Sequence, residues 1–244
     1  MLPILYQSPE LILYSYPLLM GLGWGVAYEI FFGRVPADVP RLRAQLLFWG
    51  VFVFSWAGAK VLFYLTLPAD LSKTLLSELS FWTGGGFVFY GGFLGAVAFL
   101  LLYRATGHRL TPELLWAILP SVAIGHGIGR IGCFLAGCCY GEKTEFLWGV
   151  FLHGAHRHPT QLIEALSLLV LGTYLYRSTR PRLELLVHYL CGYGALRLVV
   201  EALRGDLVRG KWGAFTPSQW ISIMLIFFGL ILLLRIRGPR RSNT

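Results

Sequence analysis

Long apolar stretches separated by short polar segments dominate this chain, and they predict helices that cross a membrane. A helix needs roughly 20 apolar residues to span the hydrocarbon core of a bilayer. Seven stretches approach that length. We therefore predict an all-α, polytopic membrane protein with about seven transmembrane helices, near residues 11–32, 45–67, 81–103, 112–133, 161–177, 184–203 and 217–235.

Composition supports a membrane protein and argues against nucleic-acid binding. Hydrophobic residues make up 56% of the chain and charged residues 14%, whereas soluble domains carry about a quarter charged residues. The net charge is +9, but the basic residues lie mainly in short loops beside apolar stretches, where they set membrane topology. No repeat or soluble domain is evident, so we predict a single transmembrane domain over residues 1–244.

The distribution of basic residues between alternate loops predicts the orientation. Twelve lysines and arginines lie in one set of loops and six in the opposite set. Because cytoplasmic loops carry the excess, we expect the N-terminus outside and the C-terminus in the cytoplasm. The longest extramembrane segment, about residues 134–160, then lies on the outer side and is long enough to cover a site.

In this orientation, polar residues from six predicted helices fall in the outer half of the membrane. Ionisable residues at such depth are costly and usually functional. His126 lies one helical turn before Arg130, on the same helix face. We therefore predict a cavity open to the outer leaflet, lined by Tyr16, Lys60, Tyr90, Arg130, Glu164, Arg197 and Glu201.

Two interpretations account for the membrane-embedded arginines. In a structural one, Arg197 pairs with Glu201 one turn later, and Arg130 pairs with Glu164 of another helix. In a functional one, these arginines and Lys60 leave an excess of positive charge that an anion completes. A phosphodiester suits this role, because the planar fork of a guanidinium binds it through two hydrogen bonds.

Glycines predict both close helix contacts and an interrupted helix. Five glycines within nine residues, at 84–86 and at Gly91 and Gly92, should weaken the third helix. Broken backbone at this depth is tolerated beside protein or a wet cavity. Glycines four residues apart also let membrane helices approach closely, at Gly21/Gly25 and Gly125/Gly129.

The histidine and the cysteines near Arg130 leave several roles open. His126 is either a packing residue or a general base beside a bound anion. Cys133, Cys138 and Cys139 are small packing residues, a redox pair, or metal ligands together with the histidines of residues 153–158. Their spacing matches no standard zinc site, and adjacent cysteines rarely chelate one ion well, so we expect no bound metal.

Seven segments, in order along the chain, carry a resemblance to a known family. They are SYPLLMGLG (15–23), GAKVLFYL (58–65), FWTGGGFVFYGGFLG (81–95), GRIGCFLAGCCYG (129–141), RHPTQLIEA (157–165), ALRLVVEALRG (195–205) and TPSQWISI (216–223). The fourth matches the skeleton of the signature GRxGNFxNxExxG, and the fifth is similar to RHPSQLYEA. Both patterns belong to the prolipoprotein diacylglyceryl transferases, which this chain resembles over nearly its whole length.

The resemblance implies a multi-pass enzyme of the bacterial plasma (inner) membrane. Members transfer diacylglycerol from phosphatidylglycerol to the lipobox cysteine of a prolipoprotein signal peptide, release glycerol phosphate and need no metal cofactor. By position, residues important in the family correspond to Tyr16, Arg130, Gly141, Arg197 and Glu201.

This chain also departs from the family pattern. Tyr90 stands where the family has the histidine of its HGG element. Cys133 and Cys138 stand at the asparagine and the glutamate of the signature. We expect the arginines to retain phosphate binding, while His126 or Glu201 replaces the missing base.

We predict that the phosphate of phosphatidylglycerol binds between the two membrane-embedded arginines. The catalytic candidates are Arg130, Arg197, His126, Tyr90 and Glu201. The substrate-binding candidates are Tyr16, Lys60, Gly91, Gly92, Cys133, Cys138, Gly141 and Glu164. Two alternatives stay open: a related lipid-headgroup transferase with another acceptor, and a non-catalytic lipid- or metal-binding protein that retains the fold.

Overall fold

The computed structural model describes residues 2–8, 12–65, 67, 88–108, 110–205 and 213–237. The predicted glycine triplet at 84–86 and the first part of the predicted helix at 81–103 lie outside these residues. The side chain of Tyr90 also lies outside the described part of the chain.

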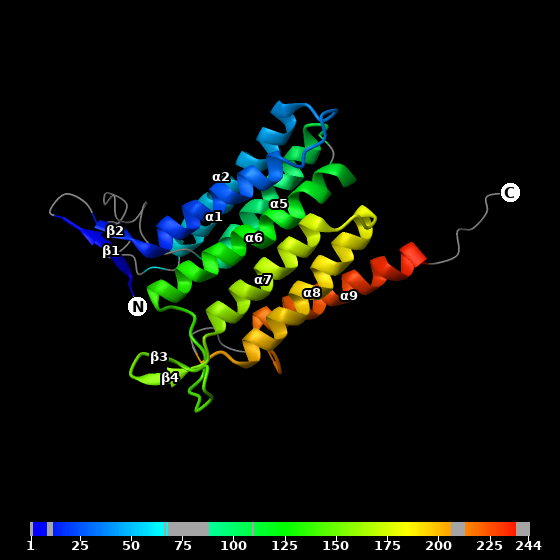
Figure 1. Cartoon of the computed structure of the whole chain (residues 1–244). Coiled ribbons are helices and arrows are strands. Elements are labelled where there is room, and N and C mark those ends of the chain that lie inside the picture. The colour runs from blue at the N-terminus through cyan, green and yellow to red at the C-terminus, as the bar shows by residue number, and fades with distance from the viewer. Residues whose placement is uncertain are drawn as a thin grey trace. The chain divides into compact units, whose positions relative to one another are not determined.

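Seven helices occur within the described residues, and each corresponds to one predicted span (Figure 1). Four of them, α2, α6, α8 and α9, are long and apolar enough to cross a membrane. The prediction of an all-α polytopic membrane protein is therefore confirmed. The bounds are α1 Ser15–Phe32, α2 Arg41–Leu65, α5 Phe89–Ala105, α6 Pro112–Ala136, α7 Thr160–Arg177, α8 Arg182–Ala202 and α9 Pro217–Arg237.

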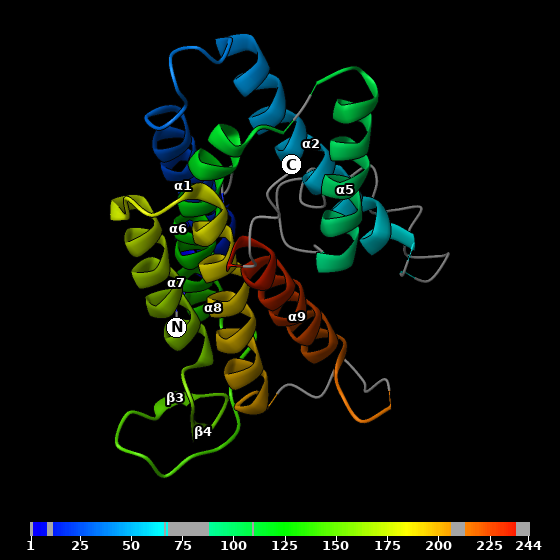
Figure 2. The ribbon, with the colours of Figure 1, turned by 90° about the vertical axis from the view of Figure 1, so that its right-hand side faces the viewer.

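Two short antiparallel hairpins accompany the helices. Strands β1 (Ile4–Gln7) and β2 (Ile12–Tyr14) precede α1. Strands β3 (Val150–Leu152) and β4 (Ala155–Arg157) come between α6 and α7 in the sequence, and Figure 2 shows them beyond the N-terminal end of α7. Their two-residue turn has positive φ at both positions, which is the conformation that fits the twist of a tight hairpin.

The chain divides into two compact units, and each is described by itself. The first unit comprises Met1–Phe31 and Leu115–Thr244, and the second comprises Phe32–Leu114. The predicted site is divided in the same way. Lys60, Tyr90, Gly91 and Gly92 belong to the second unit, whereas the other candidates belong to the first.

In the second unit, glycines let α2 and α5 pack with their backbones in contact. A Cβ at Gly58 would overlap the carbonyl oxygen of Gly91, and a Cβ at Gly91 would overlap that of Gly58. Both Gly91 and Gly92 lie inside the regular helix α5. The predicted interruption of the helix is therefore wrong at these two positions, because the close approach of α2 accounts for the requirement for glycine.

In the first unit, α1 packs on α6 at a pair of glycines. A Cβ at Gly23 would lie 2.7 Å from the carbonyl oxygen of Gly125, and a Cβ at Gly125 would lie 2.9 Å from that of Gly23. The expected contact at Gly125 is confirmed. The expected contact at Gly21 and Gly25 is wrong, because a Cβ at either position would meet no atom of the described residues within 4 Å.

Close contacts also join the later helices of this unit. A Cβ at Gly127 of α6 would lie 3.1 Å from the carbonyl oxygen of Ala165 in α7. A Cβ at Gly194 of α8 would lie 2.9 Å from the carbonyl oxygen of Ser222 in α9. Small residues at helix contacts allow such approach, so α6, α7, α8 and α9 hold their facing polar side chains at short range.

Alanine substitutions in α1 test the glycine contact. Gly23→Ala should destabilise the protein by about 1–3 kcal/mol, because the new methyl group overlaps the backbone of α6. Gly21→Ala is the matched control and should be neutral or stabilising by up to about 1 kcal/mol, because alanine favours a helix and the position is open. Thermal unfolding in detergent measures both, and equal shifts for the two variants would contradict this packing.

Candidate functional site

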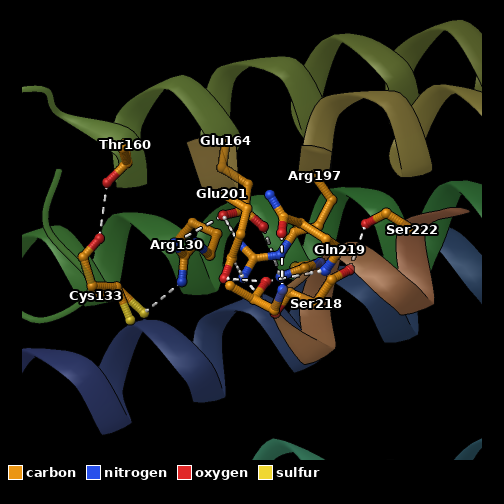
Figure 3. A network of polar contacts seen from close by, with 12 residues as sticks. Arg130, Cys133, Thr160, Glu164, Arg197, Glu201, Ser218, Gln219 and Ser222 are labelled. Carbon is orange, nitrogen blue, oxygen red and sulfur yellow. Dashed lines mark hydrogen bonds and ion pairs between the residues drawn. The ribbon is translucent and has the colours of Figure 1, made fainter. Parts of the chain in front are cut away.

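The centre of the site is Glu164 in α7, which contacts two arginines from two other helices. Its side chain is almost fully buried. Its Oε2 atom lies 2.8 Å from Nη2 of Arg130 in α6 and 3.2 Å from Nη1 of Arg197 in α8. Figure 3 shows the carboxylate between the two guanidinium groups. Three helices are therefore joined at one carboxylate.

A second carboxylate completes the charge balance. Glu201 lies one turn after Arg197 in α8, and its Oε2 atom is 2.8 Å from Nη2 of that arginine. Two guanidinium groups and two carboxylates then face one another, all at most 11% exposed along the side chain. Both ion pairs of the structural interpretation are present, together with a third between Arg197 and Glu164.

This network corrects one expectation. The sequence predicts a phosphate between the two arginines, with Lys60 contributing to an excess of positive charge. Instead, Glu164 lies between them, and the four charges of Arg130, Arg197, Glu164 and Glu201 sum to zero. The reason is that α7 places an acidic residue at the depth where α6 and α8 carry their arginines. Lys60, the third expected cation, is buried within the other unit.

The start of α9 supplies polar contacts that sequence reasoning did not single out. Thr216 and Gln219 form a reciprocal cap: the backbone N–H of Thr216 donates to Oε1 of Gln219 at 2.9 Å, and that of Gln219 donates to Oγ1 of Thr216 at 3.3 Å. The segment TPSQ carries the signal, since threonine followed three residues later by glutamine is a capping-box pattern and proline suits the first helical position.

This cap positions two hydroxyl groups at the ion-pair network. The hydroxyl of Thr216 donates to Oε1 of Glu201 at 3.0 Å. Nη2 of Arg197 donates to Oγ of Ser218 at 3.3 Å. The α9 terminus thus orients both members of the second ion pair.

His126 lies beside the same carboxylate. Its Nε2 atom is 3.9 Å from Oε1 of Glu164, which is too long for a hydrogen bond. Its ring packs edge-on against Tyr193, with the ring centroids 5.7 Å apart. The ring is partly exposed, so the predicted general base stands at the edge of the arginine network.

Arg130 keeps unused hydrogen-bonding capacity although only 8% of its surface is exposed. Nη1 donates to Sγ of Cys133 at 3.7 Å. Nη2 reaches Glu164 at ion-pair distance without hydrogen-bond geometry, and Nε has no hydrogen-bond partner in the described part of the chain. A buried donor without a partner costs about 1–3 kcal/mol, so this edge of the guanidinium favours an additional acceptor.

The end of α6 brings three cysteines together. Gly137 has a φ of 77°; its N–H bonds to the carbonyl of Phe134, and the N–H of Cys138 bonds to that of Cys133. This is a Schellman motif, which places the residue after the glycine beside the residue four positions before the glycine. The Sγ atoms of Cys133, Cys138 and Cys139 all lie within 4.8 Å of one another.

The surroundings of these thiols are positively charged. Hydrogen bonds from Cys133 and Cys138 lower the pKa of the Cys139 thiol, and the charges of Arg130 and Arg204 lower it further, against the opposing effect of burial. The predicted substrate-binding residue Tyr16 in α1 is close enough to the three cysteines and to Arg130 to interact with them electrostatically.

Comparison with known proteins identifies the family. The family model of the prolipoprotein diacylglyceryl transferases matches residues 3–235. This chain belongs to the prolipoprotein diacylglyceryl transferase family.

Curated relatives carry the name phosphatidylglycerol–prolipoprotein diacylglyceryl transferase. A Clostridium tetani protein is 36% identical over 159 residues, covering 61% of this chain and 64% of the relative. A second enzyme of this name from Clostridium perfringens is 30% identical over 250 residues, covering 95% and 94%. One from Shewanella oneidensis is 34% identical over 213 residues, covering 81% and 76%.

Gly141, a position that matches the family signature, lies where three chain segments meet. A Cβ there would lie 2.5 Å from the carbonyl oxygen of His158 and 2.9 Å from that of Leu203. Its N–H donates to the carbonyl of His158 at 3.1 Å, and its carbonyl accepts from Nη1 of Arg157 at 3.3 Å. These contacts attach the α6–α7 segment to the end of α8. They explain why the position requires glycine, whether or not a ligand binds there.

The remaining candidates of this transferase-family chain belong to the second unit. Lys60 is buried there, and Gly91 and Gly92 belong to the α2–α5 contact. Their roles as substrate-binding residues stay predictions, as does the catalytic role of Tyr90.

Removing the shared carboxylate tests the network. Glu164→Gln should destabilise the protein by about 3–5 kcal/mol, because two buried guanidinium groups would then share one carboxylate. Glu184→Gln is the matched control, since Glu184 pairs with Arg180 at 3.5 Å on an exposed surface and such pairs contribute at most about 1 kcal/mol. Unfolding in detergent, followed by circular dichroism, measures both; similar small losses would contradict a central role for Glu164.

Proposed function

We propose that this chain transfers diacylglycerol from phosphatidylglycerol to the lipobox cysteine of a prolipoprotein and releases glycerol phosphate. Membership of the transferase family supports the reaction, and the names of the relatives supply both substrates. We place the protein in the bacterial plasma (inner) membrane, with the N-terminus outside and the C-terminus in the cytoplasm. The excess of basic residues in one set of loops supports that orientation.

The observation that carries the proposal is the buried edge of Arg130. Its Nε atom has no hydrogen-bond partner among the described residues, and a phosphodiester oxygen is the acceptor that a membrane lipid supplies. Hydrogen bonds from a guanidinium to phosphate are strong because both groups are charged. We infer that the lipid phosphate binds at Arg130 from the edge that Glu164 does not cover, after the side chains that bury Nε have moved aside.

Glu164 and Glu201 act on the arginines before the substrate arrives. Ion pairs and hydrogen bonds on three sides hold Arg197 in one orientation. Donors fixed in advance stabilise a developing charge without reorganisation during the reaction. Because Glu164 already lies between the two guanidinium groups, we propose that the phosphate binds beside this pair and not between its members.

The reaction then forms one bond and breaks one bond. The acceptor sulfur, as a thiolate, attacks the glycerol carbon of the diacylglyceryl group, and a carbon–sulfur bond forms. The bond between that carbon and the phosphate oxygen breaks, and its electron pair stays on the phosphate that leaves. Arg130 and Arg197 stabilise this charge. His126 is the proposed acceptor of the thiol proton, because it stands at the edge of the network and near Glu164.

Lysine substitutions test the arginines without removing their charge. Arg130→Lys and Arg197→Lys should each lower the transfer rate by about 10²–10³-fold, since a lysine cannot form the paired hydrogen bonds of a guanidinium. The measurement is the mass shift of a lipobox peptide incubated with purified protein and phosphatidylglycerol. Alanine variants are less informative, because each would leave the buried Glu164 with only one of its two arginine partners.

The exposed Arg180 provides the matched control. Arg180→Lys should retain both the full transfer rate and the unfolding midpoint, since Arg180 lies on an exposed surface, and thermal unfolding checks that the two buried variants are still folded. Unchanged rates for the two buried substitutions would contradict the proposed role of the arginines. Lipid binding without transfer by the unsubstituted protein would favour a non-catalytic lipid-binding protein.

A further inference from the structure

The thiols of Cys133, Cys138 and Cys139 form a cluster that the proposed reaction does not yet use. All three cysteines are free, and their sulfur atoms lie within 4.8 Å of one another. The sequence predicts no bound metal, because the spacing of these cysteines matches no standard zinc site and adjacent cysteines rarely chelate one ion well. Cys139 departs from extended backbone, with a φ of 61°, and its sulfur lies with the other two. The objection to adjacent cysteines as joint ligands therefore does not hold here.

The backbone that carries these thiols is fixed from a neighbouring helix. The carbonyl of Cys138 accepts from Nε2 of Gln161 at 2.6 Å, and that of Cys139 accepts from Oγ1 of Thr160 at 2.9 Å. Both donors are fully buried at the start of α7. A left-handed conformation at a residue other than glycine costs about 1–2 kcal/mol, and these two hydrogen bonds hold it. The three thiols are thus preorganised rather than brought together by chance rotation.

Three cysteine thiolates are ligands that a zinc ion accepts. Thiolates select soft or borderline cations, zinc among them. With zinc–sulfur bonds of about 2.3 Å, sulfurs of a tetrahedral site lie roughly 3.8 Å apart, which small side-chain rotations reach from the observed separation. Nη1 of Arg130 lies 3.7 Å from Sγ of Cys133. A guanidinium in that place offsets the negative charge of a zinc ion bound by three thiolates.

The number of ligands indicates the kind of zinc site. Structural zinc sites have four protein ligands, whereas catalytic ones have three and an open position for water or substrate. No fourth side chain joins the three cysteines in the part of the chain that the structure describes. The fourth position is therefore available to a ligand from outside the chain.

We propose that Cys133, Cys138 and Cys139 bind a zinc ion whose open position binds the acceptor thiol beside Arg130. This proposal rests on the proposed function, because the reaction there alkylates a thiol. A thiol that coordinates zinc is deprotonated, and the thiolate is the nucleophile that the transfer needs. The zinc site thus supplies an activated sulfur next to the arginine that binds the lipid phosphate.

The step balances without a further reactant. The acceptor thiol would displace water from the zinc and release its proton to the solvent. Its sulfur would then attack the glycerol carbon, and the carbon–oxygen bond would break with its electrons on the departing phosphate. The product is a thioether, a neutral and weaker ligand than a thiolate, so water or the next acceptor thiol displaces it. Zinc is neither oxidised nor reduced.

Metal content is the first test. The full chain is purified in detergent with a thiol reductant, equilibrated with zinc, freed of unbound metal and analysed by elemental mass spectrometry. We expect one zinc ion per chain. Cys138→Ser and Cys139→Ser should lose it, whereas Cys191→Ser should retain it, because Cys191 lies in α8 and its thiol donates to the carbonyl of Ile226. Thermal unfolding checks that each variant folds.

Cobalt substitution tests the open position independently of transfer. Cobalt(II) bound by thiolates absorbs through sulfur-to-metal charge transfer, and this absorption should strengthen when a lipobox peptide is added. The same peptide with serine in place of its cysteine should leave the spectrum unchanged. A response to both peptides, or to neither, would overturn the assignment of the fourth position.

Activity then separates the two proposals. Removal of zinc by a chelator should lower transfer to the lipobox peptide at least 10-fold, and zinc, but not magnesium, should restore it. Full transfer by metal-free protein overturns the zinc site and leaves the transferase intact. Zinc and peptide binding without transfer from phosphatidylglycerol overturns the transferase reaction and leaves the metal site. Copper retained in place of zinc, or a disulfide among the three cysteines under reducing purification, overturns the zinc site.

Discussion

The shared use of one carboxylate by two guanidinium groups is the interaction on which this structure depends. Glu164 is almost fully buried, and a single oxygen of its side chain contacts arginines from α6 and α8. An isolated charge at this depth would be very costly. Because each charge is matched, α6, α7 and α8 can carry ionised residues on the faces where they meet. The chemistry attributed to the arginines is available only under that condition.

The start of α7 connects this network to the segment outside the helices. Thr160, Gln161 and Glu164 fall on one side of the first two helical turns, since positions four apart share a helix face. The first two residues bind the carbonyls of Cys139 and Cys138, and the third binds the arginines. A single short stretch therefore fixes the cysteine turn and the ion pairs at once. The proposed phosphate site and the proposed zinc site are consequently parts of one arrangement.

Much of the fold could be predicted because it depends on local patterns. Apolar stretches of sufficient length predicted the seven helices that the structure describes, and the segment before α7 was recognised by its length. The pairing of Arg197 with Glu201 was predictable too, because residues one turn apart on a helix are neighbours. The glycines were harder. Gly21 and Gly25 have the spacing of a contact motif, yet Gly23 makes the contact, because the side of α1 that faces α6 is set by the packing of two helices.

The sequence by itself determined the class of the protein and its membership of a family, since each follows from hydropathy or from residues close together in the chain. Only the tertiary structure decided that Glu164 occupies the place between Arg130 and Arg197, and that three cysteines point to a common centre. Those arrangements depend on how α6, α7 and α8 are rotated against one another and on a left-handed turn at Cys139. Spacing along the chain carries neither, because rotation and turn are fixed by buried contacts between distant segments.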